Sequence, residues 1–201
     1  MRSFVTARLT RRARFDEGER GASLVEFAII APLLFIMLFG IVEIGLGLRD
    51  QMTMSNAVTT GARIGSVTST DGGSDIAILQ AVEASLVGGT DIDVITRVVI
   101  YEANADGSSS GNENHYTYDP ADPTCAWDPC PDPTHPSFGG YGSPSGWLPT
   151  DRDTALPTPD ILGLRIEYTH EWVTTLIPFM RAPSNWQADA RVRLEPNVYG
   201  T

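Results

Sequence analysis

The chain has 201 residues, enough for one domain with an attached segment, and its 25 acids outnumber its 14 basic residues, for a net charge of −11. An acidic body lacks the basic surface that binds phosphates, so the sequence excludes a nucleic-acid-binding protein. The charge is also unevenly divided. Residues 1–20 carry six arginines against three acids, whereas the residues after Leu48 carry eight arginines against twenty acids.

The first predicted element is a transmembrane helix over residues 22–48. No charge interrupts residues 27–42, and eleven of these sixteen residues are Leu, Ile, Phe or Val. Those eleven favour insertion by roughly 5 kcal/mol. As a helix, residues 22–48 extend roughly 40 Å, which exceeds the roughly 30 Å hydrocarbon core of a bilayer. Because arginines precede the span, we expect residues 1–21 to form a basic cytoplasmic leader and residues 49–201 to lie outside the plasma (inner) membrane.

A secretory signal peptide would also begin basic and continue apolar. Two features argue against it, since the run is longer than an ordinary signal core and the following GLGLRDQMTM contains no clear A-x-A cleavage site. An uncleaved single-pass membrane anchor remains open.

A junction motif, GASLVEF, stands at the cytoplasmic edge of the predicted span. Glu26 is the fifth residue after Gly21, and Phe27 follows it. This order resembles the prepilin-peptidase site of type IV pilins, and most closely that of the TadE-like pseudopilins of tight-adherence systems. The resemblance covers about 45 residues and extends to Pro32, Glu43 and the GARIG segment at 61–65.

The resemblance implies that a prepilin peptidase cleaves between Gly21 and Ala22 and gives Ala22 a charged amine. A buried carboxylate is costly unless it is paired, so we expect the amine of a neighbouring subunit to neutralise Glu26 and set the register between subunits. Glu26 and Phe27 would then act in subunit assembly. The implied partners are other pilins or pseudopilins, a membrane assembly platform and the lipid bilayer.

Two further residues of the span have predicted roles. Pro32 removes one helical hydrogen bond, so we expect a kink near Ala28, either as a harmless bend or as a hinge. Glu43 lies near the outer end of the span, where we expect headgroup water to solvate it.

After the span the pattern predicts a small α+β domain of pilin-like architecture, with the first helix continuing as an amphipathic helix. Helical spacing places Met54, Val58, Ala62 and Gly65 on one face, and a second helix is predicted over 75–87. Period-two alternation predicts three strands over 92–100, 162–172 and 186–194. We expect an antiparallel sheet with one face in water and the helices on the other.

Residues 103–160 form a predicted long loop, with ten of the fourteen prolines, nine acids and one base, Arg152. Six aromatic residues favour a partly ordered excursion over pure disorder. Cys125 and Cys130 are predicted to form a disulfide in an oxidising compartment. Zinc is disfavoured because only His135 is near as a further ligand, and calcium is less favoured than a solvated acidic loop.

The sequence contains no motif that would supply a set of catalytic residues, so we predict that the protein is not an enzyme and binds no cofactor. The favoured function is a pseudopilin or minor pilin that contributes to a tight-adherence pilus or secretion apparatus. A membrane-tethered binding module, in which the 103–160 loop recognises a surface or partner, is the alternative. A tethered hydrolase is the third class, and it would need a site that the sequence does not display.

Overall fold

The structure is a computed structural model that describes residues 17–121, 124–142, 146–173 and 182–196. Its contacts divide the chain into two compact units, residues 1–41 and 42–201. The division falls seven residues before the predicted boundary at 48/49, because the helical residues from Val42 onward pack with the domain.

The first unit contains the beginning of α1, the helix Glu17–Thr68. Most of its large apolar side chains between Leu24 and Leu38 are exposed. Among the described residues, one helical stretch, Gly21–Thr68, is long and apolar enough to cross a membrane. This finding agrees with the predicted single span. The helix continues through Pro32, and the predicted kink there stays a prediction.

In the second unit, the rest of α1 buries the predicted face against the sheet and α2, Ser74–Leu86. Met54, Val58 and Ala62 are buried in the main core. Gly61 and Gly65 lie so close to the sheet that a Cβ at Gly61 would come within 2.6 Å of Leu164 and one at Gly65 within 2.9 Å of Leu162. These two glycines therefore permit close packing of the helix on the protein's own sheet.

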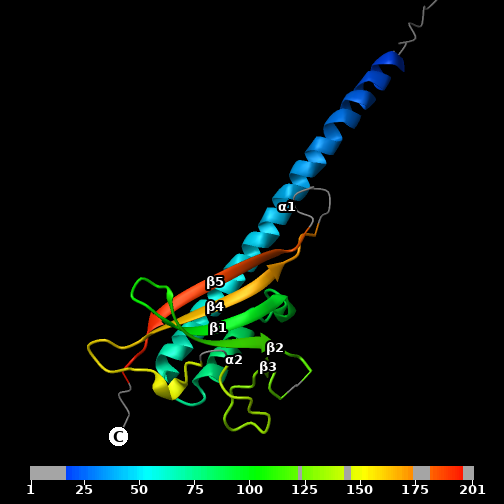
Figure 1. Cartoon of the computed structure of the whole chain (residues 1–201). Helices are drawn as coiled ribbons and strands as arrows, with labels where there is room; N and C mark the ends of the chain where they lie inside the picture. Colours follow the sequence, from blue (N-terminus) through cyan, green and yellow to red (C-terminus); the bar gives the residue numbers. More distant parts are fainter. Residues whose placement is uncertain (1–16, 122–123, 143–145, 174–181, 197–201) are drawn as a thin grey trace, which may run out of the picture. The chain divides into compact units, whose positions relative to one another are not determined.

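The sheet has five antiparallel strands in the order β3-β2-β1-β4-β5 (Figure 1). Their bounds are β1 Ile95–Ala103, β2 Ser109–Tyr118, β3 Trp127–Asp128, β4 Ile161–His170 and β5 Ser184–Arg193, with short 3₁₀ turns at η1 Ile92–Val94 and η2 Pro149–Asp151. The predicted α+β class is confirmed. The three predicted strands correspond to β1, β4 and β5, with ends shifted by a few residues.

The face of the sheet that is turned away from α1 is less exposed to solvent than predicted. Tyr101 and Val99 are buried there, with Ala103 and Ile161 beside them. The Tyr101 ring lies over Gly163, where any Cβ would overlap it, and its hydroxyl donates to Asp189 at 2.7 Å. A small second core therefore covers part of the face that the alternation assigned to water.

The 103–160 segment differs from the long loop that was predicted. It contains β2, the short β3 and η2, so β2 extends the sheet directly after β1 through a hairpin. The described part of the remainder, residues 119–121, 124–142 and 146–160, follows β2 in the chain and is irregular apart from those short elements. The prediction of a partly ordered excursion holds for this second half of the segment.

Candidate functional site

The junction residues lie together at the start of the described helix. Gly21, Ala22, Glu26 and Phe27 are all exposed on α1, and Pro32 follows on the same helix. A Cβ at Gly21 would meet nothing within 4 Å, so packing within the chain does not require glycine at this position. Cleavage after Gly21 stays a prediction.

Glu43 contradicts the expectation of a solvated carboxylate. Its side chain is 1 % exposed, although Val42 and Ile44 beside it are exposed. Gly47, one turn further along, is also buried, and a Cβ there would lie 2.8 Å from the Trp186 ring and 3.5 Å from His170 Nε2. Protein therefore covers one face of α1 at positions 43 and 47 and leaves the opposite face open.

Asp50 joins three elements at this end of the domain. Its Oδ2 lies 2.8 Å from His170 Nδ1 at the end of β4, and its Oδ1 accepts a hydrogen bond of 2.9 Å from the Thr90 hydroxyl in the α2–β1 turn. Arg49 donates to the Gly89 carbonyl at 2.8 Å. Two neighbouring helical residues therefore fix both the turn and the strand end to α1. We call this part of the second unit the Asp50 end.

His170 itself lies in an aromatic setting. It is buried, stacks on Trp186 at a centroid distance of 4.8 Å and meets Trp172 edge-on at 4.6 Å. It ends β4, which corresponds to the strand predicted over 162–172, and lies at an alternating position shared with Tyr168, which is also buried. Among the described contacts it has a carboxylate partner and no nucleophile, which is an arrangement that holds elements together.

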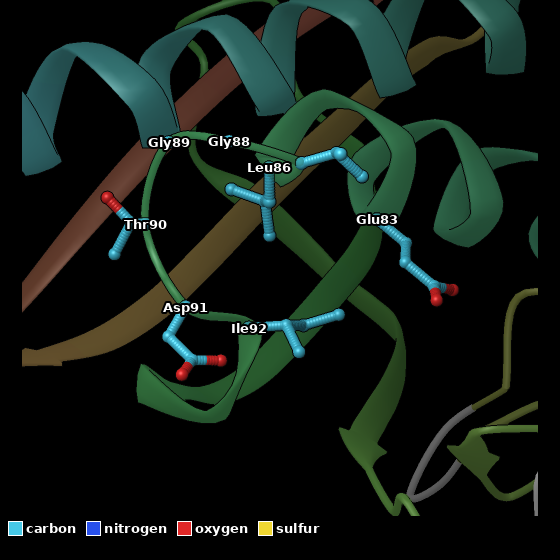
Figure 2. Close-up of a pocket in the computed structure, with 8 residues that line it drawn as sticks. Glu83, Leu86, Gly88, Gly89, Thr90, Asp91 and Ile92 are labelled. Atoms are coloured by element: carbon cyan, nitrogen blue, oxygen red, sulfur yellow. The ribbon is translucent and has the colours of Figure 1, made fainter.

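The α2–β1 turn encloses an open hollow of about 430 Å³ (Figure 2). Leu86, Val87 and Ile92 supply its apolar lining, and the carboxylates of Glu83 and Asp91 lie at its margins. Gly88 adopts φ +79°, a left-handed conformation that ends α2 and turns the chain toward β1. The hollow is lined by apolar and acidic side chains and by glycine backbone. This lining does not identify a catalytic residue.

A buried polar cluster holds the Asp119–Asp160 excursion to the core; it comprises Asp75, Asn114, Tyr116, Trp147 and Arg152. The Asp75 carboxylate pairs with Arg152 and accepts hydrogen bonds from Tyr116 at 2.6 Å and from Asn114 at 2.8 Å. The backbone of Trp147 bonds the Asn114 amide in both directions. All five side chains are buried.

The electrostatics of this cluster follow from its burial. Burial, and next the Asp75 charge, raise the pKa of the Tyr116 hydroxyl well above its ordinary value. The Arg152 guanidinium also lies over the Trp147 ring at 4.6 Å and donates to the Ser69 carbonyl. Arg152 was noted in the sequence only as the single base of its segment, and its partner 77 positions away gave no local signal.

Cys125 and Cys130 form the predicted disulfide. Their sulfurs and a His135 nitrogen lie within 4.8 Å of one another, but both sulfurs are used in the S–S bond, so this donor set does not fit a metal ion. The bridge closes a short loop that contains β3. It shapes the excursion locally.

Comparison with known families concerns the N-terminal part of the chain. Residues 21–63 match the family model described as TadE-like protein. The resemblance to the TadE-like family is thereby confirmed for this segment. The TadE-like match begins at Gly21 and includes Glu26, Phe27, Pro32 and Glu43, and it suggests a pilin-like protein associated with a tight-adherence pilus.

The TadE-like match ends at Arg63, so α2 and the whole sheet lie beyond it. No curated protein and no solved structure matches the chain. The domain after Arg63 therefore has to be interpreted from its own geometry.

Proposed function

We propose that the chain is a pseudopilin or minor pilin that contributes to assembly of a tight-adherence pilus or secretion apparatus. A prepilin peptidase removes residues 1–21, and residues 22–48 then hold the protein in the plasma membrane with the domain outside. Its partners are other pilins or pseudopilins and a membrane assembly platform. It acts as a structural subunit and performs no reaction of its own.

One observation carries this proposal: the TadE-like segment begins at Gly21 and places Glu26 on an exposed apolar helix. An exposed acid among apolar side chains is costly in lipid unless a cation approaches it. Cleavage after Gly21 creates such a cation at Ala22. A neighbouring subunit that presents its Ala22 amine to Glu26 satisfies both charges and fixes the axial offset of the two helices.

The test is Glu26→Gln in the full chain, with Glu19→Gln in the leader as the matched control. We expect Glu26→Gln to insert and lose its leader normally but to fall about tenfold or more in crosslinked assembly with wild-type subunits, since each 1.4 kcal/mol of lost pairing costs a factor of ten. Glu19→Gln leaves assembly unchanged because the leader is discarded. Normal assembly of Glu26→Gln would contradict the proposed pairing.

The alternative, a tethered binding module, has support from the buried polar cluster. Because Arg152 and Trp147 fix the excursion to the core, the excursion presents a defined surface to a partner. Replacing residues 22–48 with an unrelated membrane span separates the two functions. A pilin loses its activity in this exchange, whereas a tethered binding module keeps it.

A further inference from the structure

The Asp50 end exposes apolar side chains that the domain's own core leaves uncovered. Val87, at the end of α2, is 83 % exposed, and Val173, just after β4, is 73 % exposed. Both lie near residues that are bonded to α1, since Gly89 and Thr90 contact Arg49 and Asp50 while His170 contacts Asp50. Leu48 on the same part of α1 is half exposed.

We propose that a zwitterionic lipid surface covers the Asp50 end, so that Val87, Val173, Trp172 and Trp186 lie in the interfacial layer of the membrane. This inference rests on the membrane insertion that is part of the proposed function. It goes beyond that function because it assigns a lipid-contacting surface to the folded domain itself.

The first argument is the position of the Asp50 end along α1. A hydrocarbon core of about 30 Å takes about 20 helical residues, so a span that begins at Phe27 ends near Leu46. Arg49 and Asp50 follow within about 6 Å along the helix axis. The headgroup layer on each side is about 5 to 8 Å thick. Protein that is hydrogen-bonded to Arg49 and Asp50 therefore lies at the depth of the headgroups.

The second argument is the burial of Glu43 and Gly47. Both precede Arg49 and face protein, while Val42, Ile44 and Leu48 on the same helical turns are exposed. The Trp186 ring and His170 cover Gly47 directly. The domain therefore reaches helix positions at the edge of the expected hydrocarbon core, with tryptophan as the covering side chain. Tryptophan is enriched at this depth because its ring is apolar and its N–H is polar.

The charges at this end select the kind of lipid. A hollow bordered by η1 and the end of β4 carries Asp91, Asp93 and Glu171, all exposed. Two described cations lie on adjoining elements: Arg49, which donates to the Gly89 carbonyl, and Arg97 on β1, which is paired with Glu167. Figure 2 labels Asp91 together with Gly88 and Gly89 of the α2–β1 turn. A strongly anionic surface would repel these acids, while a zwitterionic headgroup offers an ammonium to them and a phosphate to Arg49.

The test uses the absence of free thiols in the described chain, where both cysteines are joined in the disulfide. Single cysteines replace Val87, Val173, Val67 and Leu34, each carrying an environment-sensitive fluorophore in the full chain. The proteins are reconstituted in phosphatidylcholine vesicles that contain a lipid with a spin label high on its acyl chain, or one with the label deep in the chain. Val67 is the matched control, a valine that is 65 % exposed and lies about 27 Å beyond Arg49 along α1.

We expect the shallow spin label to quench fluorophores at 87 and 173 at least twofold more than at 67, and the deep label to quench the fluorophore at 34. Exchanging part of the phosphatidylcholine for phosphatidylglycerol should reduce the quenching at 87. If position 34 is quenched while 87 and 173 behave like 67, the membrane span stands and the lipid-covered end is wrong.

Two further results of the quenching experiment would lead to different conclusions. If position 34 is not quenched by either label, membrane insertion fails and the proposed function fails with it. If 87 and 173 are shielded from aqueous iodide but not quenched by lipid, and this shielding grows with the ratio of protein to lipid, a second copy of the chain covers this end. That result would overturn the lipid assignment.

Discussion

At the scale of single residues, two carboxylates explain most of the chain's organisation. Asp50 joins α1 to the α2–β1 turn and to the end of β4, and Asp75 joins α2 to β2 and to the Asp119–Asp160 excursion. Both act through hydrogen bonds to groups that are distant in sequence. Glu26 is the third important carboxylate, and its proposed partner belongs to another subunit.

Asp75→Asn is expected to destabilise the domain by about 3 to 5 kcal/mol. The substitution keeps the shape of the side chain but leaves the buried Arg152 without its counter-charge, and removing one partner of a buried pair is strongly unfavourable. The measurement is the free energy of unfolding of the full chain in detergent, from denaturant titration followed by tryptophan fluorescence.

The matched control for Asp75→Asn is Glu167→Gln, which removes a partner from the Arg97–Glu167 pair. That pair bonds at 2.7 Å but its side chains are 40 % and 28 % exposed. A loss of at most about 1 kcal/mol is expected because water solvates both charges. Equal losses for the two variants would contradict the structural importance of the buried polar cluster.

At the scale of elements, the strands that follow simple alternation were predictable and β2 was not. In β4, inward positions such as Leu162, Leu164 and Ile166 are apolar, so period two is visible in the sequence. In β2 the sequence SSGNENHYTY places Asn114 inward, and an amide hides the alternation. Asn114 is tolerated there because Asp75 and the Trp147 backbone satisfy it. These partners of Asn114 are brought together by the tertiary fold, so the local sequence gives no sign of them.

The site residues also divide into those that a local sequence pattern predicted and those that it did not. The junction was recognisable because Gly21 and Glu26 are local in sequence, and Cys125 and Cys130 were predicted as a pair for a similar reason. The burial of Glu43 was missed because the local sequence, a glutamate near the end of an apolar run, is equally compatible with a solvated side chain. The contacts of Asp50 with Thr90 and His170 span 40 and 120 positions, which no local pattern reports.

The tyrosines of the sheet and of the Asp119–Asp160 excursion predict that the fold loses stability at alkaline pH. Burial raises the pKa of each tyrosine in the described chain, namely Tyr101, Tyr116, Tyr118, Tyr141 and Tyr168. A raised folded pKa stabilises the fold below the unfolded value of about 10, and this contribution is lost as the pH rises above that value. The free energy of unfolding should therefore fall steadily above about pH 10.

The check is a pH series of denaturant titrations combined with phenolate absorbance. Tyr116→Phe should lower stability at pH 7, because Asp75 loses a donor, but should show a shallower decline above pH 10. Phenolate should form mainly as the chain unfolds. Free titration of all the tyrosines near pH 10 in the folded protein would contradict their burial.

At the scale of the whole molecule, the chain combines a basic N-terminal segment, an apolar helix and an acidic domain. In the proposed orientation, the basic segment lies on the cytoplasmic side and the acidic domain lies outside. The helix contributes both to the span and, from Val42 onward, to the core of the domain. The proposed assembly through Glu26 and the proposed lipid contact at the Asp50 end would use different parts of that helix.

Glu26 pairing depends on a new amine at Ala22, so the state of the N-terminus tests the account most directly. The measurement is the intact mass of the chain extracted from membranes of cells with an active prepilin peptidase. The account predicts a mature protein that begins at Ala22. A chain that retains residues 1–21 under those conditions would contradict it.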